Sequence, residues 1–544
     1  TACGMRFPIM PLRKQRKNDM TALQKYRNPV ITGLHPDPSI CRVEDTFYLV
    51  ASTFEYFPGI PVYESRDLVR WKCIGHCLTR REQLELKDCH PSGGIYAPSI
   101  RYWKGRFYVT ATNVSHRGNF VVSASRPEGP WSDPVWLEAG GIDPSLYFEG
   151  ERAYLTTNES RRGEKGIYLY EIDLDTGKCL GPERLISKGC VGRFPEAPHL
   201  YRIRGNYYLL LAEGGTEYGH MVTIQRSENL LGPYVSCPYN PIVSHRDMED
   251  MRIMCTGHGD LTEDQNGNWW MVLLGVRTLT NETGMRMLHN LGRETFLAPV
   301  VWKDGWPLAG EAGRIKTEME GPLPGGYPGC GTVCPEEKCV STDTHFGPNG
   351  FSTEYIFLRN PDMDCYRFQE DGGLMLTGCG RRLSEEMGSP AMMAVRQKEF
   401  FSKCLLRLAP PYGEELCCGL TAFYSWEHHY DLCLARREGR LKLQLRKQIY
   451  DLEAVQRSVE IPDGEVTLEI HSDQEYYSFF AVDSAGKRHI LGRGAAAALC
   501  TEVTRNMSFT GTLLGFFCEM GTVRIKDFKV WSGAEQWEQN EEEP

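Results

Sequence analysis

Three acidic residues stand out in this sequence because each lies next to a proline in a similar short segment. Asp37 lies in His-Pro-Asp-Pro-Ser, Asp143 in Gly-Ile-Asp-Pro-Ser, and Glu196 in Phe-Pro-Glu-Ala-Pro-His. We interpret the three as matching positions of a repeated unit. If the repeats are the blades of a propeller, matching positions converge on one axis and the three carboxylates share one pocket. Such a pocket is suited to acid–base chemistry.

Glycoside hydrolysis is a reaction that uses carboxylates in this way. One carboxylic acid protonates the leaving oxygen, and a second carboxylate either activates water or attacks the sugar carbon. The acid must stay protonated near neutral pH, which requires burial or a neighbouring negative charge to raise its pKa. A third carboxylate can supply that charge. Taken alone, Asp-Pro-Ser is also an ordinary turn, because proline fixes φ and Asp or Ser caps the bend.

The elements that must position these acids are repeated hairpins. Each repeat reads as a short strand, a polar or glycine turn, and a second strand rich in aromatic and β-branched residues. Helical periodicity is almost absent. The repeats begin at Asp37, Ala97, Asp143, Ala197 and Gly259, roughly 45–65 residues apart. This spacing predicts an all-β fold in which residues 28–320 form a five-bladed β-propeller.

The rest of the chain is divided by changes in composition. Residues 1–27 read as a basic, polar N-terminal extension without the apolar stretch of a signal peptide. A run rich in Gly and Pro predicts a linker over 321–335. Residues 336–535 show alternating strands without the propeller repeat, which predicts a concanavalin-like β-sandwich. Residues 536–544 read as an acidic, solvated tail.

The composition excludes several classes of partner. At 544 residues the chain is too long for one ordinary core, so two domains are expected. The net charge of −10 argues against nucleic acid and anionic membranes, which attract basic surfaces. No apolar run approaches the roughly 20 residues of a transmembrane helix. We therefore expect neither nucleic acid nor a membrane as a partner.

The cysteines favour a reducing compartment. Twenty of them are spread along the chain without compact spacing, and several lie in apolar strand-like runs, where a free Cys acts as a small core residue. We expect a cytoplasmic protein, with secretion as the open alternative. The cluster of Cys330, Cys334 and Cys339 with His345 fits no standard zinc spacing, so no metal site is assigned to it.

Further segments, found in a fixed order over some 260 residues, carry a family resemblance. They are Asn28–Ser39, Ser52–Gly59, Ser65–Trp71, Gly93–Pro98, Gly214–Thr216, Gly257–Asp260 and Leu291–Phe296. With them the chain resembles the β-xylosidases and α-L-arabinofuranosidases of glycoside hydrolase family 43 that have a C-terminal β-sandwich. The resemblance implies removal of terminal β-D-xylosyl groups, and also α-L-arabinofuranosyl groups, from xylo-oligosaccharides.

The resemblance also assigns roles to the three acids. Asp37 is expected to be the general base that activates water, and Glu196 the general acid. Asp143 is expected to tune the pKa of that acid and to orient it. Enzymes of this kind invert the anomeric centre, so their two working carboxyl groups stand roughly 6.5–9.5 Å apart to admit a water molecule.

Other site residues follow from the same resemblance. Arg293 is expected to contact the substrate, because its rigid fork suits sugar hydroxyls or a nearby carboxylate. Phe57 and Tyr96 are expected to form apolar pocket walls. Phe509 belongs to a sandwich segment that reaches the pocket rim in longer relatives. His258 is expected near the propeller axis, where some relatives hold a cation. No cofactor is expected to be required, with a divalent cation such as calcium near the axis as the alternative.

The chain departs from the family pattern at two positions. Tyr96 stands where the family usually has Trp, and Ser99 stands where it often has Asp. A smaller ring and a lost carboxylate bear on which sugar is accepted and leave the reaction unchanged. The alternatives are a hydrolase for another plant-polysaccharide sugar and a non-catalytic carbohydrate-binding protein. The sequence motifs of invertase-type and sialidase-type propellers do not occur in the chain. A homo-oligomer is expected only by analogy.

Overall fold

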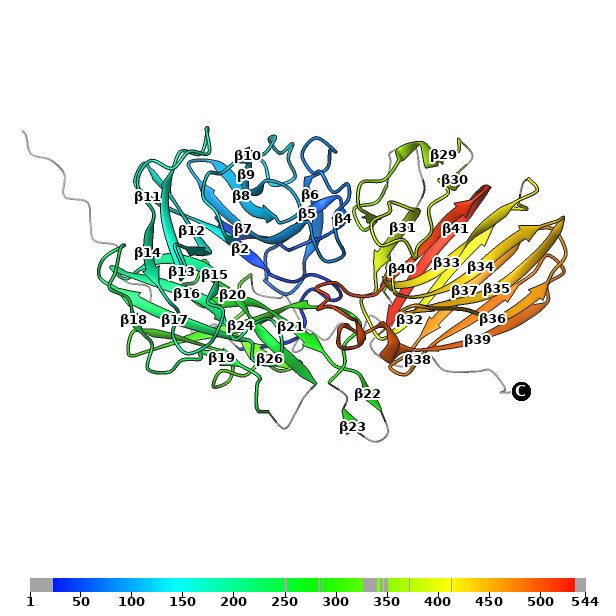
Figure 1. The fold of residues 1–544 in the computed structure, drawn as a ribbon. Coiled ribbons are helices and arrows are strands. Elements are labelled where there is room, and N and C mark those ends of the chain that lie inside the picture. The colour runs from blue at the N-terminus through cyan, green and yellow to red at the C-terminus, as the bar shows by residue number, and fades with distance from the viewer. Residues whose placement is uncertain are drawn as a thin grey trace, which may run out of the picture.

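The fold consists of two all-β domains that lie side by side, a propeller and a sandwich (Figure 1). The computed structural model describes residues 23–248, 252–281, 284–285, 287–325, 340–342, 346, 351–370, 372–411 and 413–533. The helices in these ranges are short 3-10 turns at Met363–Cys365, Ala496–Leu499 and Thr501–Val503. None of the helices in the described part is long and apolar enough to cross a membrane.

Five antiparallel sheets form the propeller, and each is built from one uninterrupted stretch of chain. The first blade contains β2 (Ser39–Val43), β3 (Thr46–Val50), β5 (Gly59–Ser65) and β6 (Lys72–Leu78). The second contains β7 (Ile95–Trp103), β8 (Arg106–Asn113), β9 (Gly118–Ala124) and β10 (Val135–Trp136). The third contains β11 (Ile142–Glu149), β12 (Arg152–Arg161), β13 (Glu164–Ile172) and β14 (Arg184–Ser187).

The last two blades follow the same plan. The fourth contains β15 (Glu196–Ile203), β16 (Asn206–Glu213), β17 (Met221–Ser227) and β18 (Val235–Ser236), and β19 (Val243–Ser244) also pairs with β17. The fifth contains β20 (Ile253–Glu263), β21 (Trp269–Arg277), β24 (Glu294–Lys303) and β25 (Trp306–Ala309). The short strands β22 (Thr280–Asn281) and β23 (Gly284–Met285) form a separate hairpin. The five-bladed propeller predicted from the repeats is confirmed.

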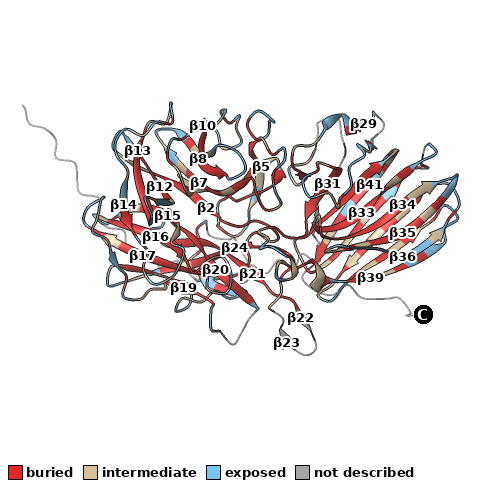
Figure 2. Cartoon of the chain, viewed as in Figure 1, coloured by how far each residue is buried: buried red, intermediate tan, exposed pale blue. Residues whose placement is uncertain are grey.

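The innermost strands of the blades, β2, β7, β11, β15 and β20, contact one another around the ring. The strands next to these innermost strands supply most of the apolar side chains that pack between blades. Figure 2 shows that buried residues run along the strands of the blades. Because the first and last blades share no strand, the ring is closed by other means. One is the pairing of β1 (Gln24–Arg27) with β26 (Glu318–Gly321). Another is Asn28, whose side-chain amide donates to the Leu297 carbonyl at 2.9 Å and accepts from the Leu297 N–H at 2.9 Å.

These closing contacts also bear on the predicted boundaries. Paired propeller structure begins at Gln24, within the predicted extension 1–27, and includes Gly321, the first residue of the predicted linker. Residues 326–335 of that linker, the predicted tail 536–544, and the cluster of Cys330, Cys334, Cys339 and His345 lie outside the described residues.

The sandwich packs two antiparallel sheets over one apolar core. One sheet contains β31 (Ala391–Arg396), β33 (Leu416–Ser425), β34 (His428–Arg437), β35 (Arg440–Ile449), β36 (Leu452–Glu460) and β40 (Leu513–Met520). The other contains β27 (Val340–Thr342), β29 (Tyr366–Phe368), β30 (Leu374–Thr377), β32 (Phe401–Leu408), β37 (Val466–Ser472), β38 (Tyr476–Val482), β39 (Arg488–Ala495) and β41 (Thr522–Gly533). The predicted concanavalin-like sandwich is confirmed.

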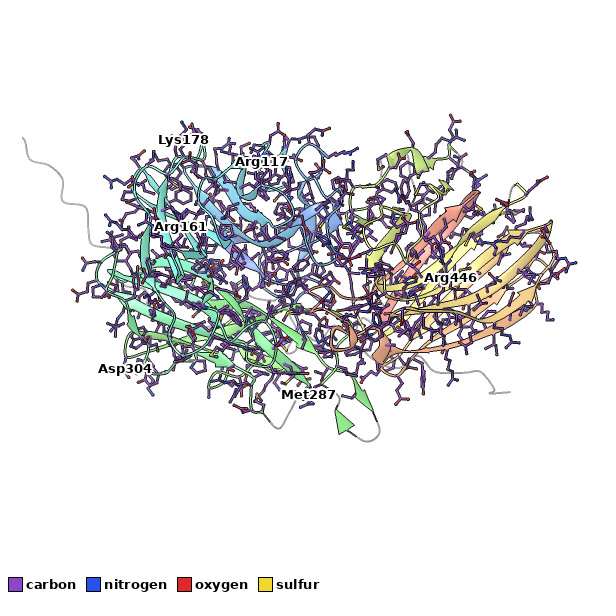
Figure 3. All side chains as sticks on the ribbon, in the orientation of Figure 1. Arg117, Arg161, Lys178, Met287, Asp304 and Arg446 are labelled. Carbon is purple, nitrogen blue, oxygen red and sulfur yellow. The ribbon has the colours of Figure 1, made fainter. Side chains whose placement is uncertain are left out.

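The two domains are joined by shared structure. Strand β4 (Tyr56–Phe57) of the propeller pairs with β28 (Phe357–Leu358), and an apolar cluster includes residues from both domains. Ion pairs and hydrogen bonds also cross between the domains: Arg277 of the propeller pairs with Glu399 of the sandwich at 2.5 Å, and Arg359 donates to the Cys89 carbonyl at 2.6 Å. Within the sandwich, Arg446, marked in Figure 3, donates to Asp431 at 2.8 Å and to Glu519 at 2.6 Å. These contacts between the domains let the sandwich contribute residues to a site on the propeller.

Candidate active site

The innermost strand of each blade begins with an irregular backbone segment, and residues of this segment line the axis of the propeller. The residue at the matching position of each blade has a positive φ, a conformation that non-glycine residues rarely adopt: Asp37 at +55°, Ala97 at +24°, Asp143 at +54°, Ala197 at +48° and His258 at +49°. In the second to fifth blades the strand register also shifts at this point. Backbone strain of about 1–3 kcal/mol at each such position is typical of functional sites.

The irregularity explains how adjacent residues reach one cavity. In a regular strand, neighbours point to opposite faces, but at a bulge two neighbours can share a side. Ile142 and Asp143 both line the cavity described next. By register, Glu196 corresponds to Ile142, and Ala197 corresponds to Asp143. The interpretation of three acids at matching positions is therefore wrong for Glu196, which precedes the matching position by one residue.

The cavity has a volume of about 140 Å³ and contains all three predicted acids. Its walls are Asp37, Phe54, Tyr96, Ala97, Ile142, Asp143, Glu196, Ala212, Thr216, His220, His258, Arg293 and Phe509. Sites for drug-sized ligands usually measure roughly 300–1,000 Å³. The cavity is therefore suited to one small ring and not to a stretch of polymer.

Asp37 is held as an ionised carboxylate. Its Oδ2 accepts a hydrogen bond from the Ser52 hydroxyl at 2.6 Å, and its Oδ1 accepts one from Arg293 Nη1 at 3.2 Å. His258 Nδ1 lies 3.4 Å from the same Oδ1. Burial raises the pKa of Asp37, but Arg293, His258 and the Ser52 hydroxyl together outweigh burial and hold the pKa below its ordinary value.

Asp143 and Glu196 form a second acidic group with the opposite tendency. Asp143 accepts a hydrogen bond from the Ala197 N–H at 3.1 Å, and Glu196 accepts a weak one from the Asn158 amide at 3.4 Å. Burial, and then the charge of Asp37, raises the pKa of Glu196 to about 7. Burial and the charges of Glu196 and Asp37 raise the pKa of Asp143 well above its ordinary value. The pair therefore keeps a proton at a pH at which two isolated carboxylates are both ionised.

An arginine beside Asp37 and three aromatic rings form another part of the cavity wall. Arg293 donates to the Thr216 hydroxyl at 2.9 Å, and its guanidinium lies 5.4 Å from the ring centroid of Phe54 and 5.3 Å from that of Phe509. Phe54 and Phe509 stack at 5.8 Å, and Tyr96 meets both edge-on. The aromatic faces give an apolar surface for a sugar ring.

Phe509 comes from the sandwich, in the orange-red segment that precedes β40 and reaches to the propeller (Figure 1). Its N–H donates to the Ser92 hydroxyl at 3.0 Å. The approach depends on two glycines, because a Cβ on Gly292 would lie 3.1 Å from the Gly511 Cα. The sandwich thus supplies one wall of the cavity.

The same arrangement of domains occurs in known proteins. Residues 26–307 match the glycosyl hydrolases family 43, and residues 343–525 match the β-xylosidase C-terminal concanavalin A-like domain. The non-reducing-end α-L-arabinofuranosidase of Bacteroides ovatus is 38% identical over 510 residues, which cover 92% of each chain. The chain belongs to glycosyl hydrolase family 43.

Two further relatives support the assignment. A xylosidase/arabinosidase of Butyrivibrio fibrisolvens is 36% identical over 81% of this chain and 86% of its own. The solved structure of a xylan β-1,4-xylosidase from Bacillus halodurans C-125 superposes with a TM-score of 0.82 at 29% identity, and covers 93% of this chain and all of its own.

The family 43 site differs from the sequence prediction at one aromatic residue. Phe57 does not line the cavity, because it lies in β4, pairs with Phe357 and packs against the sandwich and first-blade cores. Phe54, three residues earlier in the same motif, takes its place. Sequence reasoning also missed two residues of the β16–β17 connection. His220 is buried and lines the cavity, and no repeat or motif indicated it. Thr216 is a hydrogen-bond partner of Arg293.

The two departures from the family pattern have different locations. Tyr96 lines the cavity, and its hydroxyl donates to the Ser92 carbonyl at 2.9 Å. Ser99 lies deeper, where its hydroxyl is 3.1 Å from that of Ser145, and it is not part of the cavity wall. Only the change at Tyr96 therefore acts directly on the shape of the sugar site.

The residues around His258 do not suit a divalent cation. Its Nδ1 faces Asp37, whose two oxygens already accept from Ser52 and Arg293. Nowhere in the described ranges do three His, Cys, Asp or Glu side chains form a group able to hold a metal ion. The chemistry below is therefore derived from the protein's own side chains.

We predict that Phe509→Ala raises KM with little change in kcat, because the ring covers the substrate and touches no reacting atom. The loss of one aromatic contact, about 0.5–1.5 kcal/mol, corresponds to a rise in KM of about two- to tenfold. Steady-state kinetics on an aryl glycoside measure both constants. Met507→Ala, an exposed side chain in the same segment, is the matched control. An unchanged KM would show that the sandwich does not contact the substrate.

Proposed function

We propose that the protein is an exo-acting glycosidase that removes terminal β-D-xylosyl groups, and also α-L-arabinofuranosyl groups, from xylo-oligosaccharides with inversion. The observation that carries this proposal is the division of the three acids into one ionised carboxylate, Asp37, and one pair that keeps a proton, Asp143 with Glu196. These are the protonation states that a base and an acid need before the reaction starts.

In the proposed mechanism, Asp37 takes a proton from a water molecule while that water attacks the anomeric carbon. Glu196 gives its proton to the departing glycosidic oxygen in the same step, so the leaving group departs as a neutral alcohol. Asp143 belongs to the same buried pair, and because its own pKa is also raised, it helps to keep the shared proton on the pair until Glu196 gives it up. Arg293 holds Asp37 in place and keeps it ionised.

The size of the cavity supports exo action. Phe54, Tyr96 and Phe509 enclose a space of about 140 Å³, which suits one terminal sugar and not the interior of a polymer. The names of the relatives support pentose substrates, because one is an α-L-arabinofuranosidase, one a xylosidase/arabinosidase and one a xylan β-1,4-xylosidase. The two sugars present similar hydroxyl groups to such a cavity.

The test compares release of nitrophenol from the β-D-xylopyranoside, the α-L-arabinofuranoside and the α-L-arabinopyranoside. We expect turnover of the first two, and proton NMR of the first product from a β-xyloside should show α-xylose. Formation of β-xylose would contradict the inverting mechanism. If folded protein turns over none of the three substrates, the proposed function is replaced by one of the two alternatives, a carbohydrate-binding protein or a hydrolase for a different sugar.

We predict a bell-shaped dependence of kcat/KM on pH. Asp37 must be ionised, so activity rises as pH increases through its pKa, which Arg293 and His258 hold below the ordinary value of an aspartate. Glu196 must be protonated, so activity falls as pH increases through its pKa of about 7. The profile is measured with an aryl xyloside in constant ionic strength. A rate that stays level up to pH 9 would contradict the acid role of Glu196.

A further inference from the structure

Beneath the active site, the innermost strands of all five blades meet around one side chain. Arg101, on β7, donates from Nη1 to Asp260 Oδ2 at 2.8 Å and from Nη2 to His199 Nδ1 at 2.9 Å. It also reaches the hydroxyls of Ser39 at 3.2 Å and Ser145 at 3.5 Å. These residues belong to blades one to five. We propose that Arg101 is the built-in cation of the propeller axis and takes the place of a bound divalent ion there.

The charges on the axis are balanced without a metal. Asp260 is fully buried, and it accepts further hydrogen bonds from the Ser39 hydroxyl at 2.6 Å, the Ile40 N–H at 3.0 Å and the Tyr201 hydroxyl. Burial raises the pKa of Asp260, but Arg101 outweighs burial and keeps it ionised. Arg101 and Asp260 therefore form a neutral pair, which leaves no negative charge to attract a second cation.

His199 is also unavailable as a metal ligand. An arginine N–H can only donate, so His199 Nδ1 accepts from Arg101 and its ring proton must lie on Nε2. Burial lowers the pKa of His199 to about 3, which keeps the ring neutral. A metal ligand needs a free lone pair on nitrogen, and in this tautomer Nε2, which is buried and has no hydrogen-bond partner in the described part of the structure, carries a proton instead.

The residues at corresponding strand positions explain why an arginine fits. In the five blades they are Ser39, Ser99, Ser145, His199 and Asp260. Asp260 is the only carboxylate among them, so one positive charge suffices. The planar guanidinium donates to several of these acceptors at once from fixed directions, and it supplies the one positive charge that Asp260 requires.

Arg101 acts on catalysis through its neighbours. Asp260 of the fifth blade holds the Ser39 hydroxyl and the Ile40 N–H of the first blade, and Asp37 precedes Ser39 by two residues. On the other side, His258 precedes Asp260 by two residues and lies 3.4 Å from Asp37. Arg101 is therefore a positioning residue. It fixes the contact between the fifth and first blades, and this contact sets the position of Asp37.

The first test is independent of the proposed function. The wild-type protein is purified without chelator, its metal content is measured by plasma mass spectrometry, and its Tm is compared with EDTA and with added calcium. We expect far less than one metal ion per chain and the same Tm in all three conditions. About one ion per chain, with a lower Tm after its removal by EDTA, would overturn the proposal.

The second test uses Arg101→Met and Arg101→Lys, with Arg117→Met as control. Arg117 is an exposed arginine at the edge of the same blade (Figure 3). We expect Arg101→Met to lower Tm and to lower kcat by about tenfold or more, because small displacements of reacting groups cost about that much. KM should stay close to the wild-type value, because the cavity residues Phe54, Tyr96 and Arg293 are unchanged in this variant.

Arg101→Lys keeps the positive charge but loses the planar set of N–H donors, so its kcat should lie between those of the wild type and the Met variant. If the Met variant does not fold, the kcat of Arg101→Lys tests the positioning role in its place. A wild-type kcat and Tm in Arg101→Met would overturn the positioning role. This arm rests on the proposed hydrolase function, and a failure of that function would appear as an inactive wild type.

Discussion

Glu196→Gln is expected to lower kcat on xylobiose by about 10³-fold, within the range of general-acid catalysis. A leaving sugar departs as an alkoxide unless it is protonated, and glutamine has no proton to give. With a dinitrophenyl xyloside the leaving group is stable without a proton, so the loss should be far smaller. The pH profile of the residual activity on xylobiose should also lose its fall near pH 7, because the group responsible is gone.

The contrast between the two substrates identifies the acid. Glutamine keeps the oxygen that accepts from Asn158, so the local fold is conserved. Glu151→Gln, an exposed residue on the turn of the neighbouring blade, serves as the control and should behave like the wild type. If kcat falls equally on both substrates, Glu196 does not protonate the leaving group, and Asp143 becomes the candidate acid.

Asp37→Asn is expected to lower kcat by about 10³–10⁴-fold on every substrate, whatever the leaving group. The reason is that water must still be deprotonated as it attacks, and an amide cannot accept that proton. Asparagine suits this test because it tolerates positive φ, which Asp37 adopts at +55°. Binding of a xylose-type inhibitor, measured by calorimetry, should change much less than kcat.

Two comparisons separate the base from a merely structural carboxylate. Ser52→Ala removes one hydrogen bond to Asp37 and leaves the carboxylate, so it should shift the acid side of the pH profile upward with a modest loss of rate. An Asp37→Asn variant that keeps activity on the dinitrophenyl substrate would contradict the base role. A large loss of Tm in Asp37→Asn would mean that the rate does not report on catalysis.

The propeller and the set of three acids were predictable because both depend on local patterns. The hairpin repeat is visible in sequence, and closure of a ring brings similar positions together. The one-residue offset of Glu196 was already visible in the sequence, because the fourth repeat begins at Ala197. The sequence could not show the bulge by which positions 196 and 197 depart from the regular alternation of a strand, since that bulge is seen only in the positive φ of Ala197 and the register shift. Strand periodicity carries no record of a bulge.

Long-range contacts account for the other differences. Phe54 and Phe57 lie in one motif, and only the pairing of β4 with β28 of the other domain decides which ring is withdrawn from the cavity. The axial contacts of Arg101 likewise exist only after blades far apart in sequence have met. By contrast, Phe509 was placed by family resemblance, because nothing in its own segment indicates that its partner is Ser92, 417 residues away.

The contribution of Phe509 has a consequence for the order in which a newly made chain gains its function. Ribosomes release domains in order from the N-terminus, and they can begin to fold as they emerge. Asp37 emerges early, yet the wall that encloses the sugar arrives only with Phe509, which belongs to the domain that follows the propeller. A nascent propeller would therefore expose its acids in an open cleft, and the enclosed site appears only after the sandwich has been translated.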